Sequence, residues 1–277
     1  MPFTHFIFDF DGTITTADTI DVIANIGIAH QHVQGKDFKS AWAAMVDGYL
    51  ADSKQHRMEY TPNESERTTL EDEISFQRSL IDVELRSFNR VGASGLFAGM
   101  SKEKWVEEGK AAVLSGKVEV RKGFRELVRM IEMQNCVWGI VSASFSKDFI
   151  RGVLEQCLGK SVDIPIVANS ADEDGIIRGH LHEETGLNTI LATSDTKHFA
   201  MVKLLESWNL DDTAKAAYYG DSPTDIECLC SPAVKSGVVV GSNENTALLR
   251  VLAKYKVPQL AETWTPDFDR NWVIDLE

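Results

Sequence analysis

Five short apolar runs constrain the fold of this chain more than any other feature of its sequence. Each run is continuous rather than alternating between apolar and polar residues, which is typical of strands buried on both faces of a parallel sheet. Helical patterns lie between most of them, and this alternation predicts an α/β fold with helices on both faces of the sheet. The predicted strands are residues 6–10, 137–141, 164–168, 216–219 and 237–240.

The first two predicted strands are separated by residues 11–136, a stretch too long for one crossover helix. It has helical patterns of its own, punctuated by glycines such as Gly95 and Gly99. We therefore expect a helical domain at residues 16–120, inserted after the first strand, and a core domain formed by residues 1–15 and 121–277. The helices expected in the insertion are residues 19–28, 38–50, 64–90 and 102–114.

Size and charge exclude several classes of protein. The 277 residues are enough to bury a sizeable core. A formal net charge of -14 repels phosphate backbones, so we expect no nucleic acid partner. A small phosphorylated ligand is still compatible, because a metal and one or two local cations can invert the local field. No apolar run has the length of a membrane span and no signal peptide is evident, so we expect no membrane contact and a cytoplasmic location.

The cysteines and histidines do not form a recognisable metal or nucleophile motif. Cys136, Cys157, Cys228 and Cys230 lack the spacing of a zinc site. We expect all four to be reduced and packed in helices or strands.

An aspartate interrupts the first apolar run, in the stretch FIFDFDGTIT. A buried carboxylate without a partner is costly, so Asp9 requires one. One interpretation is a strand end followed by a turn at Asp11-Gly12. The other is a strand end that binds a metal and handles phosphate.

Polar residues also follow two other predicted strands. Ser142 comes directly after Val141, and Asp221 and Asp225 follow the strand at 216–219. In an open parallel sheet, ligands bind outside the carboxyl ends of the strands. The sequence therefore predicts that these side chains converge with Asp9 on one site.

Local roles at helix starts remain alternatives for some of these residues. Ser142 could cap the following helix, although Ser144 and Ser146 are equally placed to do so. Asp225 suits the positive end of a helix, and that role can coexist with a catalytic one. Lys197 falls in the first turn of a predicted helix, with its N-cap near 194–196, where a lysine opposes the helix dipole. Its charge is either exposed or directed at the carboxylates and a phosphate.

Taken together, these motifs resemble those of the haloacid dehalogenase superfamily of phosphotransferases. Their order and spacing agree, and the resemblance spans most of the chain apart from details of the insertion and the C-terminal tail. It implies a Rossmann-like core with a helical cap inserted after the first strand. The matching residues are Asp9-Phe10-Asp11-Gly12-Thr13, Ser142, Lys197 and Gly220-Asp221-Ser222-Pro223-Thr224-Asp225.

Within the superfamily the chain resembles the phosphoserine phosphatase-like branch. The segments RKGFRELV (121–128) and GDSPTDIE (220–227) look like those of the methionine-salvage phosphatases that act on 2-hydroxy-3-keto-5-methylthiopentenyl 1-phosphate. Two positions depart from the phosphoserine phosphatase pattern. Asp18 stands where those enzymes usually carry a glutamate that meets the substrate amine, and Ala143 stands where a glycine usually follows the motif serine.

The resemblance implies a phosphatase that works through an aspartyl-phosphate. Asp9 is the implied nucleophile, and Asp11 is the implied acid for the leaving alcohol and base for water. Ser142 is implied to hydrogen-bond the transferring phosphoryl group and Lys197 to neutralise its charge. Asp225 is implied to orient Lys197 or the waters of the metal.

The resemblance also implies Mg²⁺, held by Asp9, the backbone carbonyl of Asp11 and Asp221. Ala143 is expected to bind the substrate through its backbone N–H. Asp18 is a further candidate contact, although a carboxylate near a helix start explains it equally well.

Other functions remain open at this level. The expected partner is a small phosphorylated metabolite, with an enediol phosphate, phosphoserine and a phosphorylated polyol or specialised metabolite as candidates. A dehalogenase does not need an acid at Asp11, so the pair of Asp9 and Asp11 argues against that activity. A phosphomutase and a non-catalytic phosphate-binding module remain alternatives. Arg57, Arg67 and Arg78 of the insertion face either a second anionic group or solvent. The aromatic residues of the tail 262–272 are expected to pack against the core, and the sequence does not predict the oligomeric state.

Overall fold

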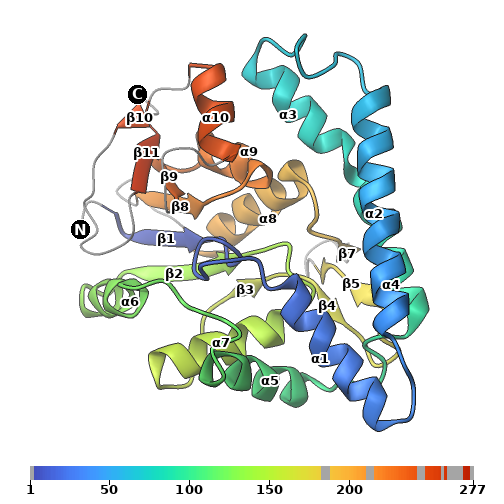
Figure 1. The fold of residues 1–277 in the computed structure, drawn as a ribbon. Helices are drawn as coiled ribbons and strands as arrows, with labels where there is room; N and C mark the ends of the chain where they lie inside the picture. The colour runs from blue at the N-terminus through green and yellow to red at the C-terminus, as the bar shows by residue number, and fades with distance from the viewer. Residues whose placement is uncertain are drawn as a thin grey trace.

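A seven-stranded sheet lies at the centre of the computed structural model, which describes residues 3–181, 188–209, 215–241, 247–256, 259–260 and 271–274 (Figure 1). The strand order is β10-β11-β9-β8-β1-β2-β3. Two small antiparallel sheets, β4-β5 and β6-β7, lie beside it. The strands are β1 (His5–Phe8), β2 (Val137–Val141), β3 (Ile166–Val167), β4 (Ser170–Ala171), β5 (Ile177–Arg178), β6 (His180–Leu181), β7 (Asn188–Thr189), β8 (Ala216–Gly220), β9 (Ser236–Val240), β10 (Gln259–Leu260) and β11 (Asn271–Ile274).

Helices cover both faces of the central sheet and also lie beyond its edge (Figure 1). Helices α5, α6 and α7 lie on one face, and α8, α9 and α10 lie on the other. The helices are α1 (Ile20–Val33), α2 (Lys39–Glu59), α3 (Leu70–Ser79), α4 (Ile81–Ser94), α5 (Lys102–Leu114), α6 (Phe124–Met133), α7 (Lys147–Leu158), α8 (Ser194–Ser207), α9 (Ile226–Leu229), α10 (Ala247–Lys254) and the 3₁₀ helix η1 (Pro223–Asp225).

Strands β9, β8, β1, β2 and β3 run parallel, which confirms the predicted α/β core. In this register Ile7 of β1 lies between Gly139 of β2 and Tyr218 of β8. Antiparallel strands β11 and β10 extend the sheet beyond β9, and the sequence did not predict them. Of the tail expected to pack against the core, residues 262–270 lie outside the described residues.

Alternate residues of β1 pack against opposite layers of helices. Phe6 and Phe8 belong to the apolar cluster that includes α6 and α7, whereas Ile7 belongs to the cluster that includes α8, α9 and α10. All three side chains are fully buried. Because both faces of the strand are covered, its sequence is continuously apolar rather than alternating.

Two predicted strands are longer than the observed ones. β1 ends at Phe8, so Asp9 and Phe10 lie in the loop that follows it rather than within the strand. β3 is reduced to Ile166–Val167, because only these two residues pair with β2.

The single helix predicted at 64–90 is wrong. The structure has α3 and α4 there, separated at Leu80, and α3 begins only after Thr69. Thr69 Oγ1 accepts a hydrogen bond from Asp72 N at 3.1 Å, and Asp72 Oδ2 accepts one from Thr69 N at 2.9 Å. This reciprocal capping starts a helix at Thr69, which the apolar pattern alone did not reveal.

The two ends of the segment 16–120 lie next to each other. Thr15 and Val120 form an isolated antiparallel bridge. Thr16 N donates to Glu119 O at 2.9 Å, and Arg121 N donates to Ile14 O at 2.9 Å. Helices α1, α2 and α4 of this segment lie toward the carboxyl ends of the parallel strands (Figure 1).

Helix α5, by contrast, packs along α7 beside the central sheet. A Cβ atom on Gly109 would lie 2.3 Å from Phe149 O, and one on Gly152 would lie 2.1 Å from Val106 O. The two glycines therefore allow the helix backbones to approach each other closely.

The four cysteines are free thiols, as expected, and Cys228 is fully buried. Among the described residues, no helix combines the length and hydropathy that a membrane span requires.

Candidate active site

Four side chains from three parts of the chain meet at the carboxyl end of the sheet. Asp9 follows β1, Asp221 and Asp225 follow β8, and Lys197 lies on α8. Carboxylate oxygens of the three aspartates lie within 4.8 Å of one another. The structure therefore brings together the residues that the sequence predicted to converge.

Lys197 is buried between two of these carboxylates. Its Nζ atom lies 2.9 Å from Asp9 Oδ1 and 2.6 Å from Asp225 Oδ1, and its side chain is 2% exposed. Helix α8 begins after Thr193, one residue before the predicted N-cap range, and Thr196 Oγ1 accepts from Thr193 N at 3.0 Å. The lysine in the first turn is thus directed at carboxylates rather than at solvent, which outweighs its unfavourable position in the helix dipole.

Asp225 accepts hydrogen bonds from several residues around it. Besides Lys197, its Oδ1 atom accepts from the hydroxyl of Tyr218 at 2.7 Å. Its Oδ2 atom accepts from Asp221 N, Ser222 N and Ser222 Oγ at 3.2, 3.1 and 3.0 Å. The local role at a helix start and the contact with Lys197 therefore coexist.

Asp221 is positioned by the loop after β1. Its Oδ1 atom accepts from Thr13 Oγ1 at 2.9 Å. Gly12 has a φ of +71°, and a Cβ atom there would lie 2.2 Å from Asp221 Oδ2. Arg121 stabilises the same loop by donating hydrogen bonds to Gly12 O at 2.6 Å and to Thr13 O at 3.1 Å. A glycine is required at position 12 for both its backbone angle and its contact with Asp221.

The cluster carries more negative than positive charge. Burial raises the pKa of Asp9 well above its ordinary value, against the opposing effect of Lys197. Burial, followed by the charge of Asp225, raises the pKa of Asp221 to about 7. Burial lowers the pKa of Lys197, but the carboxylates of Asp225 and Asp9 outweigh it, so that the ammonium stays charged.

Asp11 lies apart from the lysine and faces the start of α1. Its Oδ1 atom accepts both from Thr19 Oγ1 at 2.6 Å and from Thr19 N at 2.9 Å. Burial, followed by the charge of Asp18, raises the pKa of Asp11 to about 6. Asp11 can therefore exchange a proton near neutral pH, unlike an ordinary exposed aspartate. Asp18 itself is exposed, and its Oδ1 atom accepts from Ile20 N at 2.7 Å, which is the local helix-start role.

The loop after β2 supplies Ser142, Ala143 and Ser144. Ser142 does not cap α7, because Ser146 Oγ accepts from Phe149 N at 3.1 Å in that role. Instead Ser142 Oγ accepts from Ser144 N at 3.1 Å. The hydroxyl of Ser144 is buried without a partner among the described residues.

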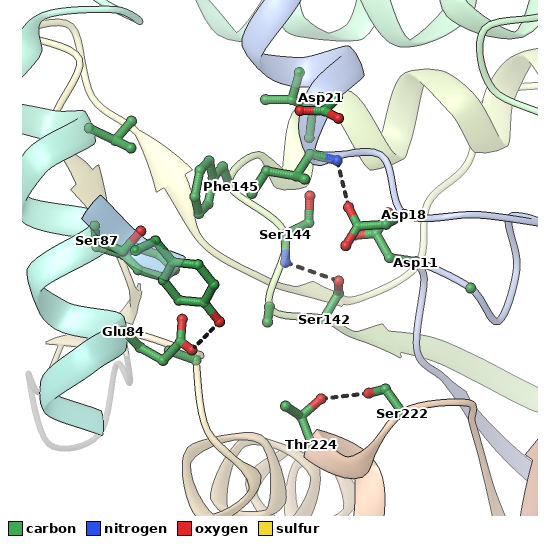
Figure 2. A pocket seen from close by; sticks show the side chains of 18 of the residues that line it. Asp11, Asp18, Asp21, Glu84, Ser87, Ser142, Ser144, Phe145, Ser222 and Thr224 are labelled. Atoms are coloured by element: carbon green, nitrogen blue, oxygen red, sulfur yellow. Dashed lines mark hydrogen bonds between the residues drawn. The ribbon is translucent and has the colours of Figure 1, made fainter. Parts of the chain in front are cut away.

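These residues line a cavity of about 580 Å³ between the sheet and the helices of the insertion. Figure 2 shows Glu84 and Ser87 on one side, Ser142 and Ser144 in the middle, and Asp11 and Asp18 on the other side. All the predicted site residues line this cavity except Asp225, which lies behind Lys197.

A divalent cation fits this donor set. Asp225 already accepts five hydrogen bonds, so Asp9 and Asp221 are the carboxylates available to a metal. Gly12 keeps the space beside the Asp221 carboxylate free of a side chain. Among the described residues the three aspartates contact a single lysine, Lys197, so a metal cation would compensate the remaining negative charge. A site with few protein oxygens suits Mg²⁺.

Several residues that shape the site were missed by the sequence analysis. Asn169, fully buried after β3, donates to Ala143 O at 3.0 Å, to Ser144 O at 3.2 Å and to Leu191 O at 2.9 Å. A buried polar residue directly after an apolar strand was the available signal for it. The roles of Thr13 and Arg121 left no such signal, because their partners lie far away in the sequence, and those of Thr19, Ser144 and Tyr218 depend on side-chain directions that the sequence pattern does not give.

Several known proteins are similar to this chain over most of its length. The CTO1 family protein C17G9.12c of Schizosaccharomyces pombe is 24% identical over 266 residues, covering 93% of this chain and 88% of that protein. A substrate-bound phosphoserine phosphatase structure is 17% identical with a TM-score of 0.47, covering 90% of this chain and 89% of that chain. A phosphoserine phosphohydrolase-like protein from Francisella tularensis is 15% identical with a TM-score of 0.49, covering 86% and 88%.

The family of haloacid dehalogenase-like hydrolases matches residues 6–229. The match covers β1 through α9 and therefore every residue of the aspartate–lysine cluster. The chain is a member of the haloacid dehalogenase-like hydrolases.

Proposed function

We propose that this protein is a Mg²⁺-dependent phosphatase that hydrolyses a small phosphomonoester through a phosphorylated Asp9. The observation that carries the proposal is the buried lysine. Lys197 contacts Asp9 at 2.9 Å while Asp11, whose pKa burial raises to about 6, lines the same cavity. A nucleophile (Asp9), a cation (Lys197) and a proton donor (Asp11) thus line the same cavity.

In the first half-reaction, a carboxylate oxygen of Asp9 attacks phosphorus. A bond forms between Asp9 and phosphorus as the bond from phosphorus to the ester oxygen breaks. Asp11 gives its proton to the departing oxygen, which leaves as a neutral alcohol.

In the second half-reaction, Asp11 is ionised and removes a proton from a water molecule. The resulting hydroxide oxygen bonds to phosphorus, and the bond between phosphorus and Asp9 breaks. Inorganic phosphate leaves, and both aspartates return to their starting states. The raised pKa of Asp11 suits both directions of this proton transfer.

Other residues stabilise and position the transferring group. Lys197 compensates charge on Asp9 and the phosphoryl oxygens, and Asp225 holds Lys197 in place through the 2.6 Å contact. Ser142 and the backbone of Ala143, at the end of β2, supply further hydrogen bonds to the phosphoryl group. Asp9, Asp221 and the backbone carbonyl of Asp11 would hold Mg²⁺, which lowers the repulsion between the carboxylate and the phosphate when bound.

Residues 16–120 act as a cap over the site, with 1–15 and 121–277 as the core domain. This proposal is supported by the common entry and exit point at Thr15 and Val120 and by the cavity that α1, α2 and α4 help to line. The methionine-salvage type of substrate, the cytoplasmic location and the absence of nucleic acid partners stay predictions from the sequence.

The test is phosphate release by the purified protein with Mg²⁺ and a panel of small phosphomonoesters. Asp9→Asn should abolish release while leaving the circular dichroism spectrum unchanged. Asp163→Asn, which alters an exposed aspartate away from the cavity, is the matched control. Undiminished turnover by Asp9→Asn would refute the assignment of the nucleophile. Transfer of phosphate back to a second position of the substrate, without release, would favour the phosphomutase alternative.

Calorimetry provides a separate readout for the metal. Mg²⁺ should bind the protein without substrate, and Asp221→Asn should weaken this binding by about tenfold or more, because it removes one of two charged ligands. Equal affinity for Mg²⁺ in Asp221→Asn would exclude Asp221 as a ligand.

A further inference from the structure

The part of the cavity beyond the aspartates has an apolar wall made by α2. Trp42, Met45, Val46 and Tyr49 follow a helical spacing, line the cavity and are half-buried. No residue of α2 is fully buried. The apolar face of this helix packs only in part against the core, through Trp42 and Met45, and its remaining surface lines the cavity, where it offers an apolar wall to a ligand.

Helix α4 places a carboxylate opposite the reacting end of the cavity. Glu84 lines the cavity, and its Oε1 atom accepts from the hydroxyl of Tyr49 at 2.9 Å (Figure 2). Burial raises the pKa of Glu84, against the opposing effect of the hydrogen bond from Tyr49. A hydrogen-bond donor or a cation on a ligand would compensate this carboxylate.

A second polar group on the cavity lining is the hydroxyl of Ser144. The Ser144 side chain is 7% exposed, and its hydroxyl has no hydrogen-bond partner among the described residues. In Figure 2 it points into the space between Phe145 and Asp11. A buried hydroxyl without a partner is costly, so this position indicates a polar ligand atom next to it.

Cations are scarce on the same lining. Of the described residues that line the cavity, only Lys197 is basic, and it is already paired with Asp9 and Asp225. Acidic residues are frequent there, namely Asp9, Asp11, Asp18, Asp21, Glu84 and Asp221. The field beyond the phosphoryl position therefore favours neutral or cationic groups and opposes a carboxylate.

The three arginines for which the sequence left open a second anionic group or solvent contact other parts of the protein. Arg67 Nε lies 3.0 Å from Glu73 Oε2, and Arg78 Nε lies 3.0 Å from Glu227 Oε1. Arg57 lies over an aromatic ring of α3, and none of the three lines the cavity.

We propose that the cavity selects phosphomonoesters whose alcohol part has an apolar body and ends in an amine or another hydrogen-bond donor that Glu84 binds, and that it rejects esters carrying a carboxylate. The apolar body lies along Trp42, Met45 and Phe88, and Ser144 bonds a polar atom close to the ester oxygen. This substrate class rests on the proposed phosphatase function and narrows it. Phosphoserine, which carries a carboxylate, is excluded by it.

Three aryl phosphates that share one ring and one reacting group test this selection. They are 4-(2-aminoethyl)phenyl phosphate, 4-ethylphenyl phosphate and 3-(4-phosphonooxyphenyl)propanoate, which end in an amine, a methyl group and a carboxylate. We expect kcat/KM to fall in that order, with the amine at least about tenfold above the carboxylate, as a hydrogen bond to a charged group implies. A carboxylate ester that equals or exceeds the amine overturns the proposal.

Substitution of Glu84 tests whether this residue is responsible for the preference among the three aryl phosphates. Glu84→Gln keeps an oxygen that can accept from Tyr49, so the helix pair is expected to stay folded, and the amine-to-methyl ratio should fall toward one. Asp82→Asn, an exposed acid on the same helix that does not line the cavity, should keep the ratio of the parent protein. An unchanged ratio in Glu84→Gln overturns the role of Glu84.

Binding separates this proposal from the proposed reaction. The three compounds are titrated by calorimetry into Asp9→Asn with Mg²⁺, where no turnover is expected. The same order of affinities supports the substrate class even if the parent protein releases no phosphate, an outcome that would refute only the phosphatase function. Phosphate release without any discrimination, or equal affinities in Asp9→Asn, overturns the substrate class and leaves the phosphatase function standing.

Discussion

Replacing Asp11 with asparagine is expected to stabilise the metal-free protein while abolishing its activity. Both hydrogen bonds from Thr19 end on one oxygen of Asp11, at 2.6 and 2.9 Å. An asparagine can keep that oxygen as its carbonyl and place its amide nitrogen at the other position. The substitution therefore removes a charge without removing these two hydrogen bonds.

The magnitude follows from the pKa of Asp11, which burial raises from 3.8 to about 6. The folded state then binds more protons than the unfolded state between these values, so stability is lost as the pH rises from 3.8 to 6. At 1.36 kcal/mol per pH unit, the ionised carboxyl costs the folded protein about 3 kcal/mol above pH 6. Asp11→Asn should recover up to that amount at pH 8 and roughly half of it at pH 5.

The assay is urea denaturation in the presence of a chelator at pH 8 and at pH 5. The control is Asp163→Asn, an exposed aspartate for which no gain is expected. A variant no more stable than the parent at pH 8, or a gain that grows as the pH falls, would refute the reasoning. Phosphate release should be lost in the same variant, because an amide cannot transfer the proton.

Three further substitutions test how the site and its supports are held together. Asp225→Asn should lower the free energy of unfolding by about 1–3 kcal/mol, since it leaves the buried Lys197 paired with Asp9 alone; a variant as stable as the parent in urea denaturation would contradict the ion-pair geometry. Gly152→Ala should cost about 1–3 kcal/mol and lower the melting temperature, because its Cβ would lie 2.1 Å from Val106 O; an unchanged melting temperature would show that α5 and α7 are not in close contact. Asn169→Ala should cost about 2 kcal/mol or more and reduce kcat/KM, because it leaves buried backbone groups of the loop after β2 without partners; full activity in phosphate release would exclude a role in positioning Ser142.

Much of the fold could be predicted because its signals are local. The five parallel strands are continuously apolar, so the α/β sheet was visible in the pattern. The errors lie where local pattern and hydrogen bonding disagree. The capping box at Thr69 delays the start of the helix predicted at 64–90, which is also divided at Leu80, and β1 ends before Asp9 because that residue is already part of the site loop.

The sequence predicted which residues form the candidate site but not which atoms they contact. The rule that ligands bind outside the carboxyl ends of parallel strands was enough to group Asp9, Ser142, Asp221 and Asp225. It did not reveal that Asp225 also accepts from Tyr218, or that Arg121 holds the carbonyls of Gly12 and Thr13. Such pairings depend on side-chain directions, which apolar periodicity does not encode.

The sequence by itself determined which segments form the five parallel strands and which polar residues follow them, because each is a property of a short segment, whereas the order β10-β11-β9-β8-β1-β2-β3 came from the structure. Only the tertiary structure decided that Lys197 is buried between two carboxylates and that the stripe on α2 faces a cavity. It also decided that the arginines of the insertion lie away from that cavity. The physical reason is that charge and burial depend on what packs against a residue, and those neighbours come from remote parts of the chain.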